Sequence, residues 1–379
     1  MKTSKKLIAA VLVIVALVFL SPFVHFAIFG NFPPGFPIGE KKNTTDRQTI
    51  DESIVPNAPI AGPEGGLDVF RSLIFFELDN LQSVHEAKKL GANGITITVD
   101  LGVQGKSFEF PSEWRGKKFE LEKVIGPFIE EAHKLGLYVE LRTTQSPWSA
   151  PTEEFDQKEL IKSYALRIEE LSRIAEKYHV YHLTTAGEID TLVHRAYKNP
   201  PKRMIAGEEI NPFAQASLKA AKGIYTGKIG IGLSAPSRYI SSQEFETLNL
   251  AGYDYFEFTL YPKPQDKNLT FFSRDAIENT NAAITISKKS NIQEIIWGET
   301  GILNNDENMP GSFGGNSAWL SGTKQFESEF YNLFFTLTNG NVDGYTIFYE
   351  FPVFSIKGQE TEATIKYWFS KSKPRNPNK

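Results

Sequence analysis

The sequence predicts an α/β fold, a single (β/α)₈ TIM barrel preceded by an N-terminal membrane segment and a linker. Eight short runs rich in β-branched and aromatic residues recur from residue 67 onward, and amphipathic stretches separate them. The chain has 379 residues, of which 41% are hydrophobic and 23% charged, so it can bury a large core. Barrels of about 250 residues or more are routinely one domain, so this length does not require several.

The predicted strands alternate with predicted helices along the whole barrel region. Alternation of this kind implies right-handed βαβ units and a parallel sheet. The competing fold is a doubly wound open sheet, but its Gly-x-Gly-x-x-Gly turn is absent after the first strand. The closed barrel is therefore favoured. The expected strands are Val69–Phe76, Gly94–Val99, Tyr138–Arg142, Val180–Thr184, Ile229–Leu233, Tyr255–Leu260, Glu294–Trp297 and Gly344–Tyr349.

Four of the intervening stretches carry clear helix signals. The strongest has apolar residues at helical spacing from Leu121 to Leu135 and a stop at Gly136. Ser241 and Glu244 form a capping box that predicts a helix ending near Gly252. The other two helices are expected over residues 160–175 and 326–337.

The amino terminus has the pattern of an export segment. Lysines precede an apolar run from Leu7 to Leu20, and the chain carries no fixed charge through Gly30. This stretch is about the ~20 residues that a helix needs to span a bilayer. Bulky residues follow it where a cleavage site would need small ones, so residues 1–30 are expected to be an uncleaved signal anchor rather than a cleaved signal peptide. The preceding lysines place the barrel outside, on the outer face of the cytoplasmic membrane, held through residues 7–29; cleavage would make it secreted.

Residues 31–66 contain six prolines and five glycines and are expected to form a semi-extended linker. The alternative for residues 50–66 is a strand or arm that wraps the base of the barrel. The catalytic barrel is expected over residues 67–372, followed by a disordered tail at 373–379.

Composition excludes several classes of function. The absence of cysteine rules out disulfides, thiolate catalysis and cysteine-ligated metals. A formal net charge of −4 without a long basic block argues against a nucleic-acid partner. The six histidines form no cluster at the strand ends, so neither a metal nor a cofactor is expected. We expect a monomer.

Two carboxylates stand out at the strand ends, where barrel enzymes place their catalytic groups. Glu188 follows Gly187 after the fourth strand, and Glu299 follows Gly298 at the end of the seventh. Strands four and seven lie on roughly opposite sides of the mouth. Hydrolysis of a glycosidic bond needs such a pair, one carboxylic acid to protonate the leaving oxygen and one carboxylate to attack the anomeric carbon.

From these positions the sequence resembles the clan of retaining (β/α)₈-barrel glycoside hydrolases that includes cellulases, β-mannanases and β-galactanases. The resemblance covers residues 67 to about 370 and implies that Glu188 is the acid/base and Glu299 the nucleophile. It also implies that Tyr261 hydrogen-bonds the nucleophile and that the ring of Tyr349 forms the floor of the subsite that binds the sugar to be cleaved. The sequence departs from the clan at Gly187, where an Asn usually contacts the sugar 2-hydroxyl. The Ala-Gly-Glu and Gly-Tyr-Thr-Ile-Phe-Tyr segments are most similar to β-mannanase-like members.

Other polar and aromatic residues at the strand ends and in the loops are candidates for substrate binding. Arg142 could orient a carboxylate or form a structural ion pair, and the Tyr261-Pro262 turn could be purely structural. Asp190 is expected to be a helix cap rather than an acid. Aromatic loop residues could stack on sugar faces. The remaining candidates are Asp79, Asn80, Trp148, His194 and Trp319.

The resulting prediction is an exported retaining glycoside hydrolase that cleaves β-linked polysaccharide or oligosaccharide by double displacement. The alternative is a catalytically degenerate barrel that binds glycans at the cell surface without hydrolysis. An inverting hydrolase is a third reading, for which the two carboxyl groups would lie about 6.5–9.5 Å apart instead of about 5–5.5 Å.

Overall fold

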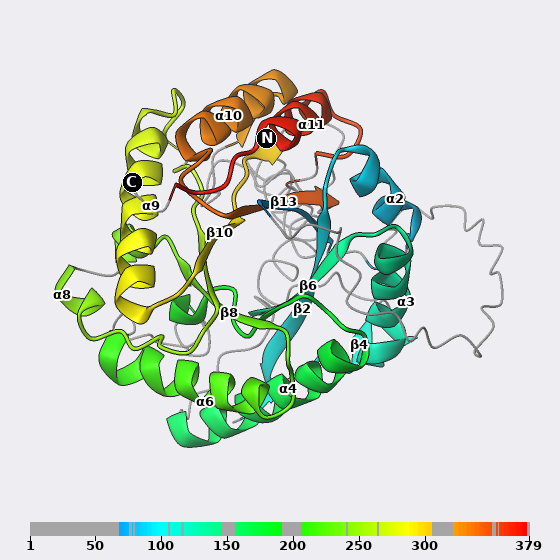
Figure 1. Cartoon of the computed structure of the whole chain (residues 1–379), viewed down its shortest axis with the longest axis vertical. Helices are drawn as coiled ribbons and strands as arrows, with labels where there is room; N and C mark the ends of the chain where they lie inside the picture. Colours follow the sequence, from blue (N-terminus) through cyan, green and yellow to red (C-terminus); the bar gives the residue numbers. More distant parts are fainter. Residues whose placement is uncertain are drawn as a thin grey trace, which may run out of the picture. The chain divides into compact units, whose positions relative to one another are not determined.

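Eight parallel strands close into a barrel in the computed structural model (Figure 1). Each strand pairs with its neighbour along the chain, and β1 pairs with both β2 and β13, which closes the ring. All eight predicted strands are confirmed, with ends that shift by a few residues. They are β1 (Phe70–Phe75), β2 (Gly94–Gln104), β6 (Tyr138–Gln145), β7 (His182–Thr184), β8 (Lys228–Ser234), β9 (Tyr255–Thr259), β10 (Glu294–Glu299) and β13 (Gly344–Glu350).

The structure describes residues 68–75, 78, 80–104, 107–114, 117–145, 156–191, 206–239, 242–263, 265–304, 321–350, 354 and 356–376. The predicted signal anchor and linker therefore lie outside the described residues. No helix within the described part of the chain is long and apolar enough to span a membrane.

Helices surround the ring of strands, as each βαβ crossover requires (Figure 1). The helices predicted from residues 121, 160 and 326 are confirmed as α3, α4 and α10, and Asp156 caps α4 through the backbone N–H groups of residues 158 and 159. The longer helices are α2 (Gln82–Lys89), α3 (Leu121–Lys134), α4 (Gln157–Lys177), α6 (Asn211–Lys222), α9 (Thr270–Ser290), α10 (Lys324–Thr338) and α11 (Thr361–Lys371). Short elements decorate this frame: π-helix η1 (Ala206–Ile210), α7 (Pro236–Tyr239), α8 (Ser242–Phe245), β3 (Ser107–Glu109), β4 (Glu113–Trp114), β5 (Lys117–Lys118), β11 (Leu303–Asn304) and β12 (Ser321–Gly322).

The prediction of a helix that ends near Gly252 is wrong in its length, because α8 ends at Phe245. The reason is a set of side chains on α6 that bind the following backbone in a non-helical path. Asn211 donates to the carbonyl of Thr247 and accepts from the N–H of Asn249, each at 2.8 Å. Bonds to another helix satisfy the backbone groups that a continued helix would have used.

The barrel has an apolar layer outside its strands and a polar interior. Most buried hydrophobic residues form one cluster, which packs the strands against the helices. Barrel interiors are usually filled with branched apolar side chains. Here the polar or ionisable side chains that project inward and are 0% exposed include Ser72, Thr96, Glu140, Arg142, His182, Thr184, Glu257 and Thr346.

The carboxyl-terminal residues beyond α11 lie against the barrel. Arg375 donates from Nε to Asp343 at 2.9 Å and from Nη2 to the carbonyl of Gln293 at 2.7 Å. The backbone N–H of Lys373 donates to the side chain of Asn339 at 2.8 Å. Residues 373–376, which the sequence assigns to a disordered tail, are thus hydrogen-bonded to the rest of the barrel, because Asp343, Gln293 and Asn339 offer acceptors to this segment.

Candidate active site

Glu299 lies at the carboxyl end of β10, and each of its two oxygens has a fixed partner. The hydroxyl of Tyr261 donates to Oε2 at 2.7 Å, and Nη2 of Arg142 lies 3.2 Å from Oε1. The residue is only 9% exposed. A guanidinium and a phenol hydroxyl both favour the ionised form of a carboxyl group. Glu299 is therefore placed as a carboxylate.

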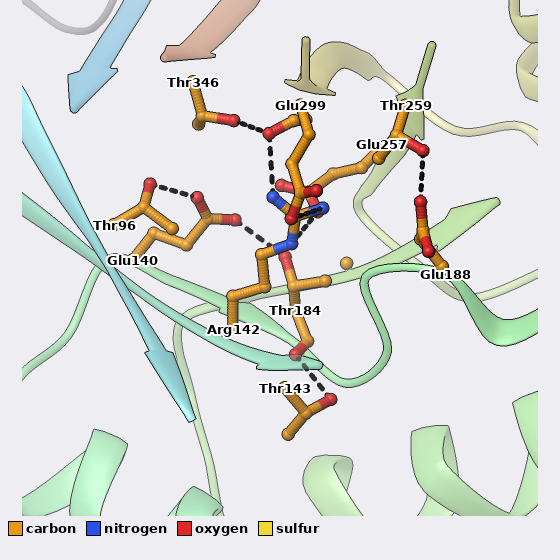
Figure 2. Close-up of polar contacts among 12 residues, drawn as sticks. Thr96, Glu140, Arg142, Thr143, Thr184, Glu188, Glu257, Thr259, Glu299 and Thr346 are labelled. Carbon is orange, nitrogen blue, oxygen red and sulfur yellow. Dashed lines mark hydrogen bonds and ion pairs between the residues drawn. The ribbon is translucent and has the colours of Figure 1, made fainter. Parts of the chain in front are cut away.

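Arg142, on β6, is fully buried and acts as the cation of the site. Its Nη1 donates to the carbonyl of Gly298 at 2.7 Å, and its Nε lies 3.4 Å from Oε2 of Glu257 (Figure 2). Burial alone would lower the pKa of Arg142. Electrostatic interaction with the carboxyl groups of Glu257 and Glu299 outweighs burial and raises it, so the guanidinium stays positive at every accessible pH.

Two glycines leave the space that the Arg142 side chain fills. A Cβ on Gly187 would lie 2.6 Å from Nε of Arg142, and a Cβ on Gly298 would lie 3.1 Å from Nη2. These glycines directly precede Glu188 and Glu299. The small residue before each glutamate is thus explained by a guanidinium that passes between the two strand ends.

Glu188 follows β7, and threonine hydroxyls bind it. Thr259, at the end of β9, donates to Oε1 at 2.5 Å (Figure 2). Thr191 donates to Oε2 at 3.4 Å. The charge of Glu188 contributes to the raised pKa values of both Arg142 and Tyr261, as does the charge of Glu299. Both carboxyl groups therefore lie within electrostatic reach of the same cation and the same phenol.

Asp190 joins the loop after β7 to the end of β8. Its Oδ1 accepts from the N–H of Ser234 at 2.7 Å and its Oδ2 from the hydroxyl of Ser234 at 2.9 Å. Burial, with a smaller contribution from the charge of Glu188, raises the pKa of Asp190 to about 7. The expectation of a helix cap is wrong, because the side chain is directed to the neighbouring strand end instead.

Tyr261 belongs to an aromatic group beside Glu299. Its ring centroid lies 5.4 Å from that of Phe354 and 6.4 Å from that of Phe348. Burial raises the pKa of the Tyr261 phenol well above its usual value, and the charges of Glu299 and Glu188 add to the effect. The phenol therefore remains a hydrogen-bond donor to Glu299.

Tyr349 does not lie where the resemblance implies. Its hydroxyl donates to Glu86 on α2 at 2.8 Å, and its ring contacts Phe75 at a centroid distance of 5.8 Å. Successive side chains of a strand point to opposite faces, so Tyr349 faces the helices while Phe348 faces the mouth. The aromatic residue of β13 beside Tyr261 is thus one position earlier than expected.

The other candidates contribute less to the described site. Asn80 accepts a hydrogen bond from the N–H of Gln82 at 3.1 Å and so supports the start of α2. Asp79, Trp148, His194 and Trp319 lie outside the described residues. Among the residues that the structure describes, no three carboxylate or imidazole side chains are grouped to hold a metal ion.

The sequence reasoning missed Thr259, Phe348 and the interior pair Glu140 and Glu257. Glu140 lies two residues before Arg142, and Glu257 two residues before Thr259, so each shares a strand face with a residue of the mouth. This spacing is a signal that could have pointed to them.

Solved structures with a similar fold include glycoside hydrolases. A GH113 β-mannanase from Alicyclobacillus acidocaldarius matches with a TM-score of 0.53 at 13% identity, over 80% of this chain and 98% of that one. The endo-1,4-β-D-mannanase of Thermotoga petrophila matches with a TM-score of 0.54 at 12% identity, over 81% and 100%. An endoglucanase from Thermotoga maritima matches with a TM-score of 0.53 at 13% identity, over 82% and 97%. These likenesses show the fold. No protein-family profile and no curated protein sequence matches the chain.

Proposed function

We propose that the protein is an exported glycoside hydrolase that cleaves β-linked polysaccharide or oligosaccharide with retention of configuration. One observation carries the proposal. Two carboxyl groups, Glu188 and Glu299, come from strands separated only by β8 and β9; Glu299 contacts Arg142 and Tyr261, and Glu188 contacts Thr259 at the end of β9. Paired carboxyl groups at a barrel mouth can supply the acid and the carboxylate that cleavage of a glycosidic bond requires.

The contacts of Glu299 support the role of nucleophile. Its carboxylate is held ionised by Arg142 and Tyr261, so an oxygen can attack the anomeric carbon and form a glycosyl ester. Glu188 donates its proton to the leaving oxygen in that step. It then removes a proton from water, which attacks the ester and releases the sugar with its original configuration.

The substrate class follows from the likeness to mannanases and endoglucanases. The solved neighbours act, by their names, on β-1,4-mannan or are endoglucanases. We propose β-1,4-linked mannan and glucan as the first substrates to examine. A barrel that binds such glycans without cleaving them is the alternative, and the departure at Gly187 is the observation that favours it.

The site of action is the outer face of the cytoplasmic membrane in this proposal. The basic and apolar pattern of residues 1–30 supports export, with attachment through residues 7–29. Fractionation of cells that produce the full chain tests this: the protein should be recovered with membranes and be degraded by protease added outside. A chain recovered only in the cytosol would contradict it.

A panel of β-linked glycans incubated with the full chain tests the activity, beside the Glu299→Ala and Glu188→Ala variants. Release of sugar by the wild type and loss in both variants supports the proposal. Azide added to Glu299→Ala should enter the space left by the carboxylate and give a glycosyl azide of inverted configuration. Binding of a glycan without any cleavage would favour the degenerate barrel.

A further inference from the structure

The barrel interior below Glu299 holds ionisable groups beyond those assigned a part in the double-displacement chemistry. Glu140 and Arg142 come from β6, His182 from β7 and Glu257 from β9, and all four are 0% exposed. Figure 2 shows the side chain of Arg142 beside those of Glu140, Glu257 and Glu299. The guanidinium pairs with Glu257 and Glu299, and the charge of Glu140 adds to the raised pKa of Arg142.

Glu140 is surrounded by donors that favour its ionised form. The hydroxyl of Thr96 donates to Oε2 at 2.6 Å, and the hydroxyl of Thr184 donates to Oε1 at 2.7 Å (Figure 2). The hydroxyl of Tyr255 lies 3.4 Å from Oε1. A carboxylate that accepts two or three hydrogen bonds is stabilised as an anion even when it is buried.

Glu257 has the opposite surroundings. Within the described part of the chain, no N–H or O–H group donates to either of its oxygens in hydrogen-bond geometry, although Nε of Arg142 lies 3.4 Å from Oε2. Glu140 and Glu257 both lie beside Arg142 in the buried interior, and each shifts the pKa of the other. An ionised Glu257 would thus be a second buried anion beside Glu140, which is unfavourable because neither oxygen has a hydrogen-bond donor that compensates for lost hydration.

The directions of the pKa shifts agree with these surroundings. Burial and the charge of Glu140 raise the pKa of Glu257 well above its usual value. Burial also acts to raise the pKa of Glu140, but the hydrogen bond with Glu257 and the charges of His182 and Arg142 outweigh it, and the pKa is lowered.

We propose that Glu140 and Glu257 share one proton at the centre of the barrel, carried by Glu257 and directed at Glu140. The pair then has a single negative charge. Arg142 keeps its closest ion pair with Glu299 instead of dividing its charge between Glu299 and an ionised Glu257. Glu257 is by this account a positioning residue for the nucleophile, and in naming Glu299 the nucleophile the inference rests on the proposed function.

The other ionisable groups around Glu140 and Glu257 have partners of their own or stay neutral, so they do not take up the shared proton. His182 faces Glu140 across the β6–β7 pairing, and its Nε2 lies 3.3 Å from Oε2 of Glu294 at the lower end of the barrel. Glu294 also binds Lys228, and although burial opposes it, these contacts lower the pKa of Glu294 to about 2. Tyr255 has a pKa well above its usual value, mainly through burial, and stays neutral.

Infrared difference spectroscopy on the full chain tests the location of the proton without turnover. At pH 8.5 the wild type should show the C=O stretch of a protonated carboxylic acid, and Glu257→Gln should lack it. Asp190 and Glu327, whose pKa values burial raises to about 7, are mostly ionised at that pH. Glu327→Gln, which removes a buried carboxyl group on α10, is the matched control and should retain the band. A band that persists in Glu257→Gln, or is absent from the wild type, overturns the inference.

The pH profile of kcat/KM on a cleaved glycan tests the coupling to Glu299. Glu257→Gln keeps a neutral group of the same shape and should leave kcat/KM within about threefold and the acid limb unmoved. Glu140→Gln removes the anion that holds the proton, so Glu257 can ionise against Arg142, and the acid limb should move up by about one pH unit. The double variant Glu140→Gln/Glu257→Gln should bring the limb back to or below that of the wild type.

If Glu140 and Glu257 have only a structural role, the double variant should lose at least as much kcat/KM as the worse single variant. The acid limb of its pH profile should then not move back toward that of the wild type. That result overturns the inference. If Glu140→Gln does not fold, the spectra of the wild type and Glu257→Gln decide alone. If no glycan is cleaved, the proposed function fails, while the infrared band still reports on the shared proton.

Discussion

The two strand ends that carry glutamate have the same local sequence pattern and different surroundings. At β10, Glu299 contacts a buried guanidinium and a phenol. After β7, Glu188 contacts the hydroxyls of Thr259 and Thr191. A fixed cation favours a permanent carboxylate, whereas hydroxyl groups can donate to a carboxylate or accept from a carboxylic acid. In the proposed mechanism, these surroundings rather than the shared Gly-Glu pattern distinguish the nucleophile from the acid/base.

Removal of the nucleophile should have the largest effect. Glu299→Ala is expected to lower kcat by about 10⁴-fold or more, because no covalent intermediate can form. Measurement of kcat with and without azide checks this, since azide should restore turnover and give the inverted glycosyl azide. Residual activity near that of the wild type would mean that another residue attacks the sugar.

Removal of the acid/base should cost less, and the loss should depend on the leaving group. Glu188→Ala is expected to lower the rate on a natural glycan by about 10²–10⁴-fold, the usual range for general acid catalysis. On an aryl glycoside with an activated leaving group, formation of the intermediate needs no proton, so a burst of the phenol should precede slow steady turnover. Equal losses on both substrates would contradict the acid role.

The two glycines that flank Arg142 offer a graded test of its placement. A methyl group at Gly187 would lie 2.6 Å from Nε and one at Gly298 would lie 3.1 Å from Nη2, so the first must displace the guanidinium further. Gly187→Ala is expected to lower kcat by about 10²-fold, as small misplacements of catalytic groups do. Gly298→Ala is the milder matched variant. A harmless Gly187→Ala would show that the position of Arg142 is not needed.

The phenol of Tyr261 should contribute a smaller share. Tyr261→Phe removes the 2.7 Å hydrogen bond to Glu299 and leaves the ring packed against Phe354. The expected loss in kcat/KM is about tenfold, the lower end for a hydrogen bond to a charged group. A pH profile should show the acid limb at higher pH, because one contact that favours the ionised carboxylate is gone. An unchanged profile would place the phenol outside the reaction.

The smallest effect on turnover is expected at Asp190, where the main change is in stability. Its pKa is raised from 3.8 to about 7, chiefly by burial, so between these values the folded state binds more protons than the unfolded state. The free energy of unfolding should therefore fall as pH rises through this window, by on the order of 3–4 kcal/mol.

Asp190→Asn keeps the shape and can still accept from the N–H of Ser234 and donate to its hydroxyl. Urea unfolding of both chains should give similar stability near pH 4 and a more stable variant at pH 8. A difference that does not change with pH would contradict the raised pKa.

Local sequence signals predicted the barrel well because each strand is a short run rich in β-formers bounded by breaks. These local signals failed where contacts between residues far apart in the sequence determine the structure. The capping box at Ser241 predicts a long helix, but Asn211 on α6 binds the following backbone. The prediction for Tyr349 was wrong because the order of strands does not show which side chains of a strand point into the barrel. In β13 the inward position belongs to Phe348, and Tyr349 points outward to Glu86.

The buried charged residues inside the barrel could not be predicted from the sequence for a related reason. In an isolated strand, alternating polar residues such as Glu140 and Arg142 suggest a face in water. Closure of the barrel turns that face into the buried centre, and only the partner from another strand, Glu257, shows why charge is tolerated there. Spacing along one strand cannot supply that partner.

The stereochemistry of the first product tests the central claim most directly. Proton NMR during the first minutes of hydrolysis of a β-linked oligosaccharide by the full chain resolves the anomeric signals before they equilibrate. Attack by Glu299 followed by water predicts that the β-anomer forms first and the α-anomer grows in by mutarotation. Initial formation of the α-anomer would mean a single displacement by water, and Glu299 would then be a base rather than the nucleophile.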